Sequence, residues 1–220
     1  MKFAIQHKTI GSCSVGHIRT TFEGNSIPFI TLTDHSIRYA AAIAGESSSL
    51  DLGIVLSHLI ARHTEDTISG HNSGTPLADI PLDPCTIGGC INTTTTLVAI
   101  ETLWPKVLHI VPETNGETSE AFAQRSNGPL SLPIQFEISS HSTHTKKPPG
   151  HIRYRMVGRQ LYHPHSKHFT AELLLQDTTY SYDDLRNHGR LQWAGDETVI
   201  TTPNINTTFV VYNRISPEYV

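Results

Sequence analysis

The chain has 220 residues, of which 37% are hydrophobic, and this suits one domain with a sizeable core or at most two small ones. Its 16 Lys and Arg residues against 20 Asp and Glu give a formal net charge of -4, which provides no basic surface for nucleic acid or anionic lipid. No apolar stretch is long enough to span a bilayer, and residues 1–8 lack the apolar segment of a secretory signal. Three cysteines, an odd number, argue against a disulfide framework. We therefore expect a protein of the cytoplasm or nucleus that binds neither nucleic acid nor membrane.

The first half of the chain predicts little regular structure apart from one strand and one helix. The strand-like run is Ile27–Thr33, and the helix is expected from about Leu50 to Arg62, with Leu52, Leu56, Leu59 and Ile60 forming an apolar stripe. Polar stretches at 64–84, 113–131 and 139–150 predict long loops.

The second half alternates between apolar and polar residues as strands do. Strands are expected at 106–111, 134–138, 152–162, 169–175, 179–182 and 207–212. Because short turns join several of them, neighbouring strands should pair antiparallel. The sequence predicts a single α+β domain over residues 1–220, dominated by an antiparallel β-sheet.

Two short pairs of cysteine and histidine residues have the spacing of zinc knuckles. Three residues separate Cys13 from His17, and four separate Cys85 from Cys90, with glycines beside or within both pairs. A structural zinc ion takes four such ligands in a tetrahedron, two from each tight turn. The sequence therefore predicts a Cys3His zinc site, and the alternative is three unrelated small core residues and a surface imidazole.

Residues 161–185 predict a β-hairpin that brings a histidine near an acidic residue. If the turn is centred between residues 175 and 176, His168 lies directly opposite Asp183, with the Cβ atoms about 5 Å apart. If the turn lies one residue further along, the partner of His168 becomes Leu185. Strand register therefore does not choose the carboxylate by itself.

An imidazole beside a carboxylate has a recognised catalytic use. The carboxylate fixes the tautomer and orientation of the imidazole, which then takes a proton from a Ser or Cys nucleophile. The candidate catalytic residues are His168 as the base and Asp183 as its partner, with Asp184 as the other possible acid. The competing interpretation is a surface hydrogen bond without catalysis.

The same segment resembles the histidine box of the ubiquitin-specific protease (USP) family of cysteine deubiquitinases. In that family a strand leads into Gly-His-Tyr-x-Ala, and the chain returns as Trp-Tyr-x-Phe-Asp-Asp. Here Tyr154–His163 is similar to the leading strand, Lys167–Ala171 to the box and Thr179–Asp184 to the return. Leu103–Ile110 is similar to the Leu-Pro-x-Val-Leu-x-Ile strand before the box, and Thr208–Arg214 to the closing strand.

The resemblance implies a papain-like cysteine peptidase fold of the USP type. Residues 1–100 would form a fingers-like region, with the helix at about 50–62 and a zinc ribbon held by Cys13, His17, Cys85 and Cys90. Residues 101–220 would form an antiparallel palm. By this resemblance, the chain lacks a counterpart of the family's helical thumb.

The sequence departs from the family at the nucleophile. The family's box Gly-x-x-Asn-x-Gly-Asn-Thr-Cys-Tyr does not occur, and Cys13 lies between glycines with no helical periodicity after it to lower its pKa. Lys167 also replaces the glycine that precedes the histidine in the family.

The resemblance implies removal of ubiquitin from protein conjugates by a domain that is partial or inactive as this chain. The partner would be ubiquitin or a ubiquitin-like protein. The alternatives are a non-catalytic ubiquitin-binding module and, from the sequons Asn92–Thr94 and Asn206–Thr208, a β-rich adhesion domain.

Overall fold

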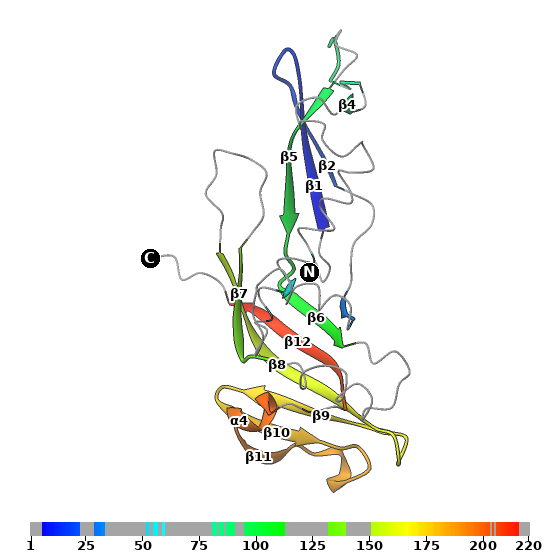
Figure 1. Cartoon of the computed structure of the whole chain (residues 1–220), viewed down its shortest axis with the longest axis vertical. Coiled ribbons are helices and arrows are strands. Elements are labelled where there is room, and N and C mark those ends of the chain that lie inside the picture. Colours follow the sequence, from blue (N-terminus) through cyan, green and yellow to red (C-terminus); the bar gives the residue numbers. More distant parts are fainter. Residues whose placement is uncertain are drawn as a thin grey trace.

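The computed structural model describes residues 6–22, 29–33, 52, 55–56, 59, 81–82, 84–85, 87–90, 95–112, 132–139, 151–202, 204 and 206–215. These residues form two β-sheets that lie end to end along an elongated molecule (Figure 1). The predicted loops were 64–84, 113–131 and 139–150, and of these residues 64–80, 113–131 and 140–150 lie outside the described residues. At the ends of two of them the structure has strand instead, at Pro81–Leu82 and at Ser139.

The smaller sheet has four strands in the order β2-β1-β5-β4. All its pairs are antiparallel, and the β1–β5 register shifts between Ile10 and Gly11, where β5 carries one extra residue. None of these strands was predicted from the sequence; they cover Gln6–Cys13 (β1), Ile18–Phe22 (β2), Pro81–Leu82 (β4) and Thr95–Leu103 (β5).

The larger sheet has eight strands, in the order β11-β10-β9-β8-β12-β6-β3 with β7 paired to β8. All six strands predicted for the second half of the chain are present. They are β6 (Val107–Pro112), β7 (Gln135–Ser139), β8 (His151–His163), β9 (His168–Leu175), β10 (Thr178–Tyr182) and β12 (Thr207–Ile215). The predicted run Ile27–Thr33 contains β3 (Ile30–Leu32), which pairs parallel to β6 and is an exception to the predicted antiparallel pairing. Strand β11 (Gln192–Asp196) was not predicted.

The core of the larger sheet follows from the alternation within its strands. In β8 the buried residues Ile152, Tyr154 and Met156 alternate with exposed or half-buried ones, as a sheet with one packed face requires. The Tyr154 hydroxyl donates to the carbonyl of Pro105 at 2.6 Å, so the buried ring leaves no unpaired polar group.

The predicted helical stripe is confirmed where the structure describes it. Leu52, Val55 and Leu56 are helical and fully buried in the core of the larger sheet, and the helical Leu59 packs against it. Each such side chain contributes about 1.5–3 kcal/mol by leaving water. Ile60 and the ends of the helix lie outside the described residues.

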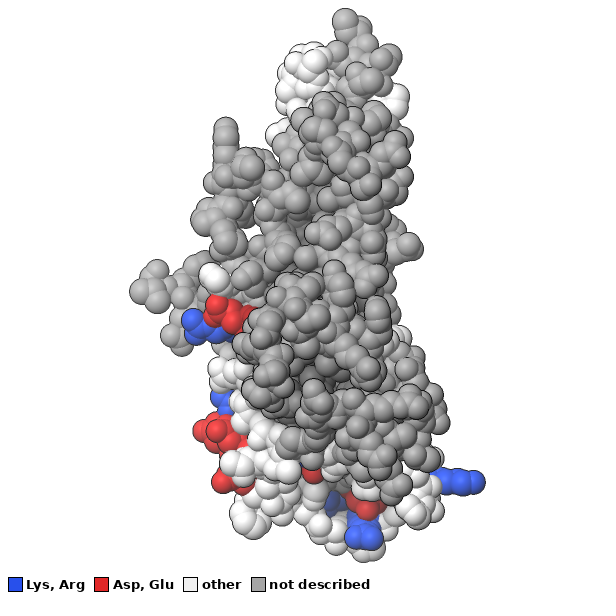
Figure 2. All heavy atoms as spheres, viewed as in Figure 1, with Lys and Arg blue, Asp and Glu red and all other residues white. Residues whose placement is uncertain are grey.

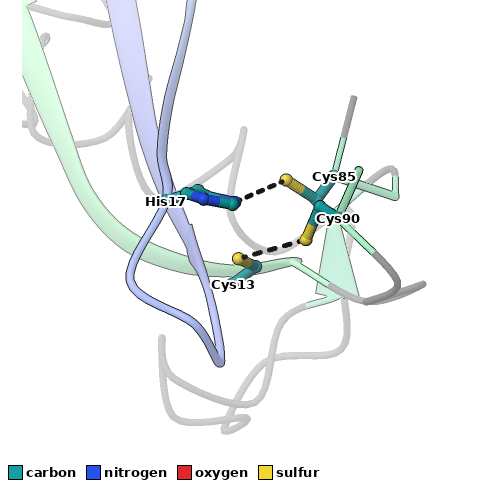
Figure 3. A group of neighbouring side chains, drawn as sticks. All are labelled: Cys13, His17, Cys85 and Cys90. Carbon is teal, nitrogen blue, oxygen red and sulfur yellow. Dashed lines mark hydrogen bonds between the residues drawn. The ribbon is translucent and has the colours of Figure 1, made fainter. Parts of the chain in front are cut away.

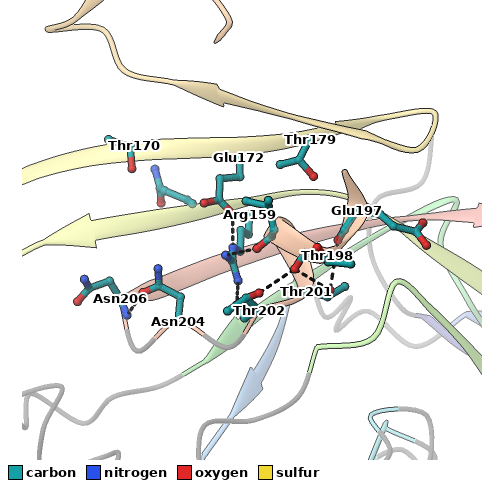
Figure 4. Close-up of polar contacts among 12 residues, drawn as sticks. Arg159, Thr170, Glu172, Thr179, Glu197, Thr198, Thr201, Thr202, Asn204 and Asn206 are labelled. Atoms are coloured by element: carbon teal, nitrogen blue, oxygen red, sulfur yellow. Dashed lines mark hydrogen bonds and ion pairs between the residues drawn. The ribbon is translucent and has the colours of Figure 1, made fainter. Parts of the chain in front are cut away.

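A buried ion pair attaches the short helix α4 (Glu197–Thr201) to the larger sheet. The Arg159 side chain on β8 is 3% exposed, and its Nε lies 2.7 Å from Oε2 of Glu172 on β9. The same guanidinium donates to the carbonyls of Val199 and Thr202 at the end of α4 (Figure 4). At the other end, the Asp196 side chain accepts from the Thr198 backbone N–H and caps the helix.

The described residues are mostly β-structure, with less helix than the α+β prediction suggests. Besides α4 and the helical residues between 52 and 59, they contain only a 3-10 turn, η2 (Asn187–Gly189). None of the described helices has the length and hydropathy needed to cross a membrane.

Candidate functional site

Two tight turns in the smaller sheet carry the cysteine and histidine pairs. In the turn between β1 and β2, the Cys13 N–H donates to the His17 carbonyl at 3.1 Å, and Gly16 has a φ of 86°. In the turn after β4, the Cys90 N–H donates to the Ile87 carbonyl at 3.0 Å, and Gly89 has a φ of 82°. In both turns a left-handed glycine precedes the second residue of the pair, which lets the chain bend back and present both side chains on one side.

The structure brings all four predicted zinc ligands together. Cys13 Sγ lies 3.9 Å from Cys90 Sγ, and Cys85 Sγ lies 3.6 Å from His17 Nδ1 (Figure 3). All four ligand atoms lie within 4.8 Å of one another, and the three cysteines form no disulfide. Zn–S bonds of about 2.3 Å and Zn–N bonds of about 2.0 Å give tetrahedral edges of roughly 3.7 Å between sulfurs and 3.5 Å between sulfur and nitrogen. The cluster can therefore hold a zinc ion with small side-chain adjustments.

The environment of Cys85 disfavours a free thiolate. A hydrogen bond from the Ile87 backbone lowers its pKa, but partial burial and the neighbouring Cys90 and Cys13 thiols outweigh that bond, so the pKa of Cys85 lies above its ordinary value. A bound cation reverses this balance, since thiolate ligands are deprotonated by the metal they bind.

The second site is at the far end of the molecule, where β9 begins and β10 ends. The turn between these strands is Gln176–Asp177, because Leu175 pairs with Thr178. The register that sets His168 directly opposite Asp183 is therefore wrong, and the alternative register, shifted by one residue at the turn, is correct.

His168 and Asp183 nevertheless make the expected contact, with 2.9 Å between Nε2 and Oδ1. Strand β10 ends at Tyr182, so Asp183 is the first residue of a turn rather than part of the ladder. In that turn Asp183 Oδ1 accepts from the Leu185 N–H at 2.9 Å, and the Asp183 carbonyl accepts from the Arg186 N–H at 3.2 Å. The turn, and not cross-strand opposition, aims the carboxylate at the imidazole.

Asp184 also lies near the imidazole, with its Oδ1 3.3 Å from Nε2 of His168. The side chains of His168 and Asp183 are 17% and 21% exposed, whereas that of Asp184 is 63% exposed. Because both carboxylates face Nε2, we assign the ring proton to Nε2, and Nδ1 keeps its lone pair. Asp183, which is better buried and held by its own turn, is the stronger orienting group.

The carboxyl of Asp183 is held in its ionised form. Partial burial raises its pKa, but hydrogen bonds from His168 and from the Leu185 N–H, together with the charges of His168 and Arg186, outweigh burial and hold it below its ordinary value. Asp183 is therefore a charged partner for His168 at neutral pH.

His168 and Asp183 line a cleft of about 580 Å³ formed by the β8–β9 turn and the segment that follows β10. Other side chains on its wall include those of His163, Glu172, Arg186 and Arg190. None of the three cysteines of the chain lines it, because all three lie in the turns of the smaller sheet. The cleft thus holds the His168–Asp183 pair without a cysteine on its wall.

The residue before His168, Lys167, stands where the USP pattern has glycine, and its backbone conformation is one that favours glycine. Lys167 has a φ of 51°, a left-handed conformation that glycine adopts freely and lysine does not, and its N–H donates to the Pro164 carbonyl at 3.3 Å. A glycine at this place in the family pattern suits that backbone.

Arg186 and Arg190 are residues of the cleft that the sequence analysis missed. They follow the acidic pair in a polar segment with no periodicity, and the reversal of the chain between them depends on left-handed residues. Only the preceding Asp-Asp pair signalled that this segment lies near the site.

No model of a known protein family matches the chain, and no characterised protein matches it by sequence. Among solved structures, the chain is similar to one of the SAGA Ubp8/Sgf11/Sus1/Sgf73 DUB module bound to ubiquitin aldehyde, with 14% identity and a TM-score of 0.45 over 97% of this chain and 42% of that chain. It is also similar to a structure of the Ubp8-Sgf11-Sgf73-Sus1 SAGA DUB module, with 13% identity and a TM-score of 0.40 over 97% of this chain and 39% of that one. The chain therefore spans about two fifths of the length of the chains it matches.

Proposed function

We propose that this chain is a partial ubiquitin-specific protease-like domain that supplies the base of a thiol-dependent isopeptide hydrolysis. The observation that carries the proposal is the 2.9 Å contact between His168 Nε2 and Asp183 Oδ1 on the wall of a cleft. The ordered motifs from Leu103 to Arg214 support it, as does the Cys3His cluster at the end of the smaller sheet. In this proposal the smaller sheet is the fingers region and the larger sheet is the palm.

The proposed chemistry assigns one role to each nitrogen of His168. Its Nδ1 accepts the proton of a cysteine thiol, the thiolate attacks the isopeptide carbonyl, and the resulting imidazolium returns the proton to the leaving amine. Asp183 holds Nε2–H, fixes the ring orientation and stabilises the imidazolium. Asp184 adds a second, more solvated carboxylate. The thiol comes from a segment other than those that carry the three cysteines of this sequence.

The tautomer of His168 is the first property to test. Long-range ¹H–¹⁵N correlation spectra of the full chain distinguish the two neutral tautomers. We expect His168 to be protonated at Nε2, and Asp183→Ala to abolish that preference. His151 is a matched control because its Nδ1, not its Nε2, lies 2.8 Å from a carboxylate, that of Glu137. An Nδ1-protonated His168 would contradict the proposed role.

Two further experiments test whether the partner is ubiquitin and whether a cysteine outside the zinc cluster is the nucleophile. Titration of ¹⁵N-labelled ubiquitin with the chain should shift ubiquitin amide resonances, and no shift at high concentration would rule out this partner. Ubiquitin with a C-terminal electrophile should label the full-length gene product at a cysteine other than Cys13, Cys85 or Cys90. If no cysteine of that product is labelled, the proposed thiol-dependent hydrolysis is contradicted.

The second candidate function is a non-catalytic ubiquitin-binding module. It is favoured by the absence of all three cysteines from the wall of the cleft. Binding of ubiquitin that persists unchanged in His168→Ala, together with no electrophile labelling of the full-length product, would support this candidate over the enzyme.

A further inference from the structure

The acidic side chains on the wall of the cleft already have cationic or hydrogen-bonding partners. Asp183 is bound by His168 and also faces Arg186, whose Nε lies 3.6 Å from its Oδ2. Glu172 is paired with the buried Arg159 at 2.7 Å. Neither carboxylate is therefore free to bind a cationic ligand, although both line the cleft.

Arg190, by contrast, lines the cleft with no ion pair or side-chain hydrogen bond to any residue that the structure describes. Among the described residues, the side chain of Arg186 makes only the long 3.6 Å contact, and it is largely exposed to solvent. Once the Glu172–Arg159 and Asp183–Arg186 pairs are set aside, Arg190 is the charged side chain of the described cleft wall that keeps no charged partner. On the face shown in Figure 2, the described Lys and Arg side chains form no broad patch and have Asp and Glu side chains near them.

A strained turn places both arginines at the cleft. Asn187, His188 and Gly189 all have left-handed φ values, of 52°, 55° and 67°. Backbone bonds close the turn, from the Gly189 N–H to the Arg186 carbonyl and from the Arg190 N–H to the Asn187 carbonyl, both at 3.1 Å. Two of these residues are not glycine, and backbone strain of this kind is concentrated at functional sites. Because of this turn, the side chains of Arg186 and Arg190 both line one cleft.

We propose that Arg190, assisted by Arg186, forms a carboxylate-binding subsite for a peptide beside His168. A guanidinium recognises a carboxylate through paired, charge-assisted hydrogen bonds. The net negative chain lacks the extended basic field that a nucleic acid needs, which favours an acidic peptide. The inference deepens the proposed function, on which it rests for the placement of a peptide in the cleft.

The carboxylate has two sources. One is an acidic side chain of the peptide, and the other is a C-terminal carboxylate, the group that isopeptide hydrolysis leaves on the released acyl product. Both present the same chemistry to Arg190, so the test separates them.

The test measures binding of four fluorescein-labelled peptides of equal length to the full chain by fluorescence anisotropy. The peptides combine Glu or Gln at internal positions with a free or an amidated C-terminus. We expect tighter binding of the peptides that carry the relevant carboxylate, weakening with added salt, and a loss of about tenfold or more in Arg190→Ala. Arg190→Lys should recover part of the loss, because a lysine restores the charge without the bidentate geometry.

Arg153→Ala is the matched control, because Arg153 is an exposed arginine of β8 that pairs with Glu137 and does not line the cleft. It should leave all four affinities unchanged. A preference for Glu over Gln identifies an acidic side chain, and a preference for the free terminus identifies a C-terminal carboxylate. Equal binding of all four peptides, or equal effects of Arg190→Ala and Arg153→Ala, would overturn the subsite.

The failure of this inference can be distinguished from failure of the proposed function. Ubiquitin binding without any carboxylate preference contradicts only the subsite. Carboxylate-dependent binding of the peptides by a chain that does not bind ubiquitin contradicts only the proposed function.

Discussion

Replacing Glu172 with glutamine should destabilise the chain far more than the loss of one surface charge does. Glu172 is 15% exposed and is the only carboxylate among the described residues that pairs with Arg159, whose side chain is 3% exposed. Removing one partner from a buried ion pair costs about 3–5 kcal/mol, because the other charge stays buried without compensation. The glutamine carbonyl still accepts from Arg159 Nε, and the carbonyls of Val199 and Thr202 stay in place. We therefore expect the lower end of the range, about 3 kcal/mol.

Urea unfolding of the full chain, followed by the fluorescence of the buried Trp104 and by far-UV circular dichroism, measures this change. Agreement of the two probes supports the two-state treatment that the comparison needs. At roughly 2–4 °C per kcal/mol for a chain of this size, Tm should fall by about 6–12 °C.

Glu137→Gln is the matched control, because Glu137 pairs with the exposed Arg153 and should change stability by about 0–1 kcal/mol. The double variant Arg159→Met with Glu172→Leu, which buries no charge, should recover most of the loss. Equal destabilisation by Glu172→Gln and Glu137→Gln would refute the reasoning that this pair is buried and anchors α4.

Three further predictions concern the two sites. The purified chain should contain one zinc ion per molecule by elemental analysis, and Cys90→Ser should lose it; a metal-free protein of unchanged stability would contradict the cluster. Lys167→Gly should raise the free energy of unfolding, because relief of the left-handed φ, about 1–2 kcal/mol, exceeds the entropy of about 0.4–1 kcal/mol that glycine adds to the unfolded chain. Ser166→Gly, at a position without positive φ, should lower it. Folding lowers the pKa of Asp183, so the stability that its carboxylate contributes is complete above the unfolded pKa and is lost as the pH falls through the folded pKa. Urea midpoints measured from pH 5 downward should therefore fall less steeply in Asp183→Asn than in the unchanged chain. Identical slopes would contradict the lowered pKa.

The strands that could be predicted from the sequence are those whose pattern of apolar residues is local. Strand β8 was predicted because Ile152, Tyr154 and Met156 recur at every second position, which records the packed face directly in the sequence. Strand β1 was missed because its run mixes histidine, lysine, threonine and glycine without that alternation, and β5 because threonines and four consecutive apolar residues replace it. Their pairing also joins segments about 90 residues apart.

For His168 and Asp183 the sequence predicted the contact, but only the fold decided the geometry that makes it. The sequence left two registers open, and the structure has the one with the turn at Gln176–Asp177, in which His168 and Asp183 are not opposite each other. The contact between them depends instead on the end of β10. The hydrogen bond from the Leu185 N–H to Asp183 turns the carboxylate back toward the imidazole, and that local bond has no periodic signature.

The amino-acid sequence alone determined the kinds of group available to this protein: two ligand pairs with knuckle spacing, a histidine followed by an acidic pair, and a second half that alternates as a sheet. These properties depend on neighbours within a few residues, where backbone periodicity limits the choices. Tertiary structure decided that the two ligand pairs meet, which carboxylate holds His168, and that Arg186 and Arg190 face one cleft. Such contacts depend on strand register, on turns with left-handed residues and on packing between distant segments. The free energy of each of these features is determined by the whole folded chain and not by neighbouring residues.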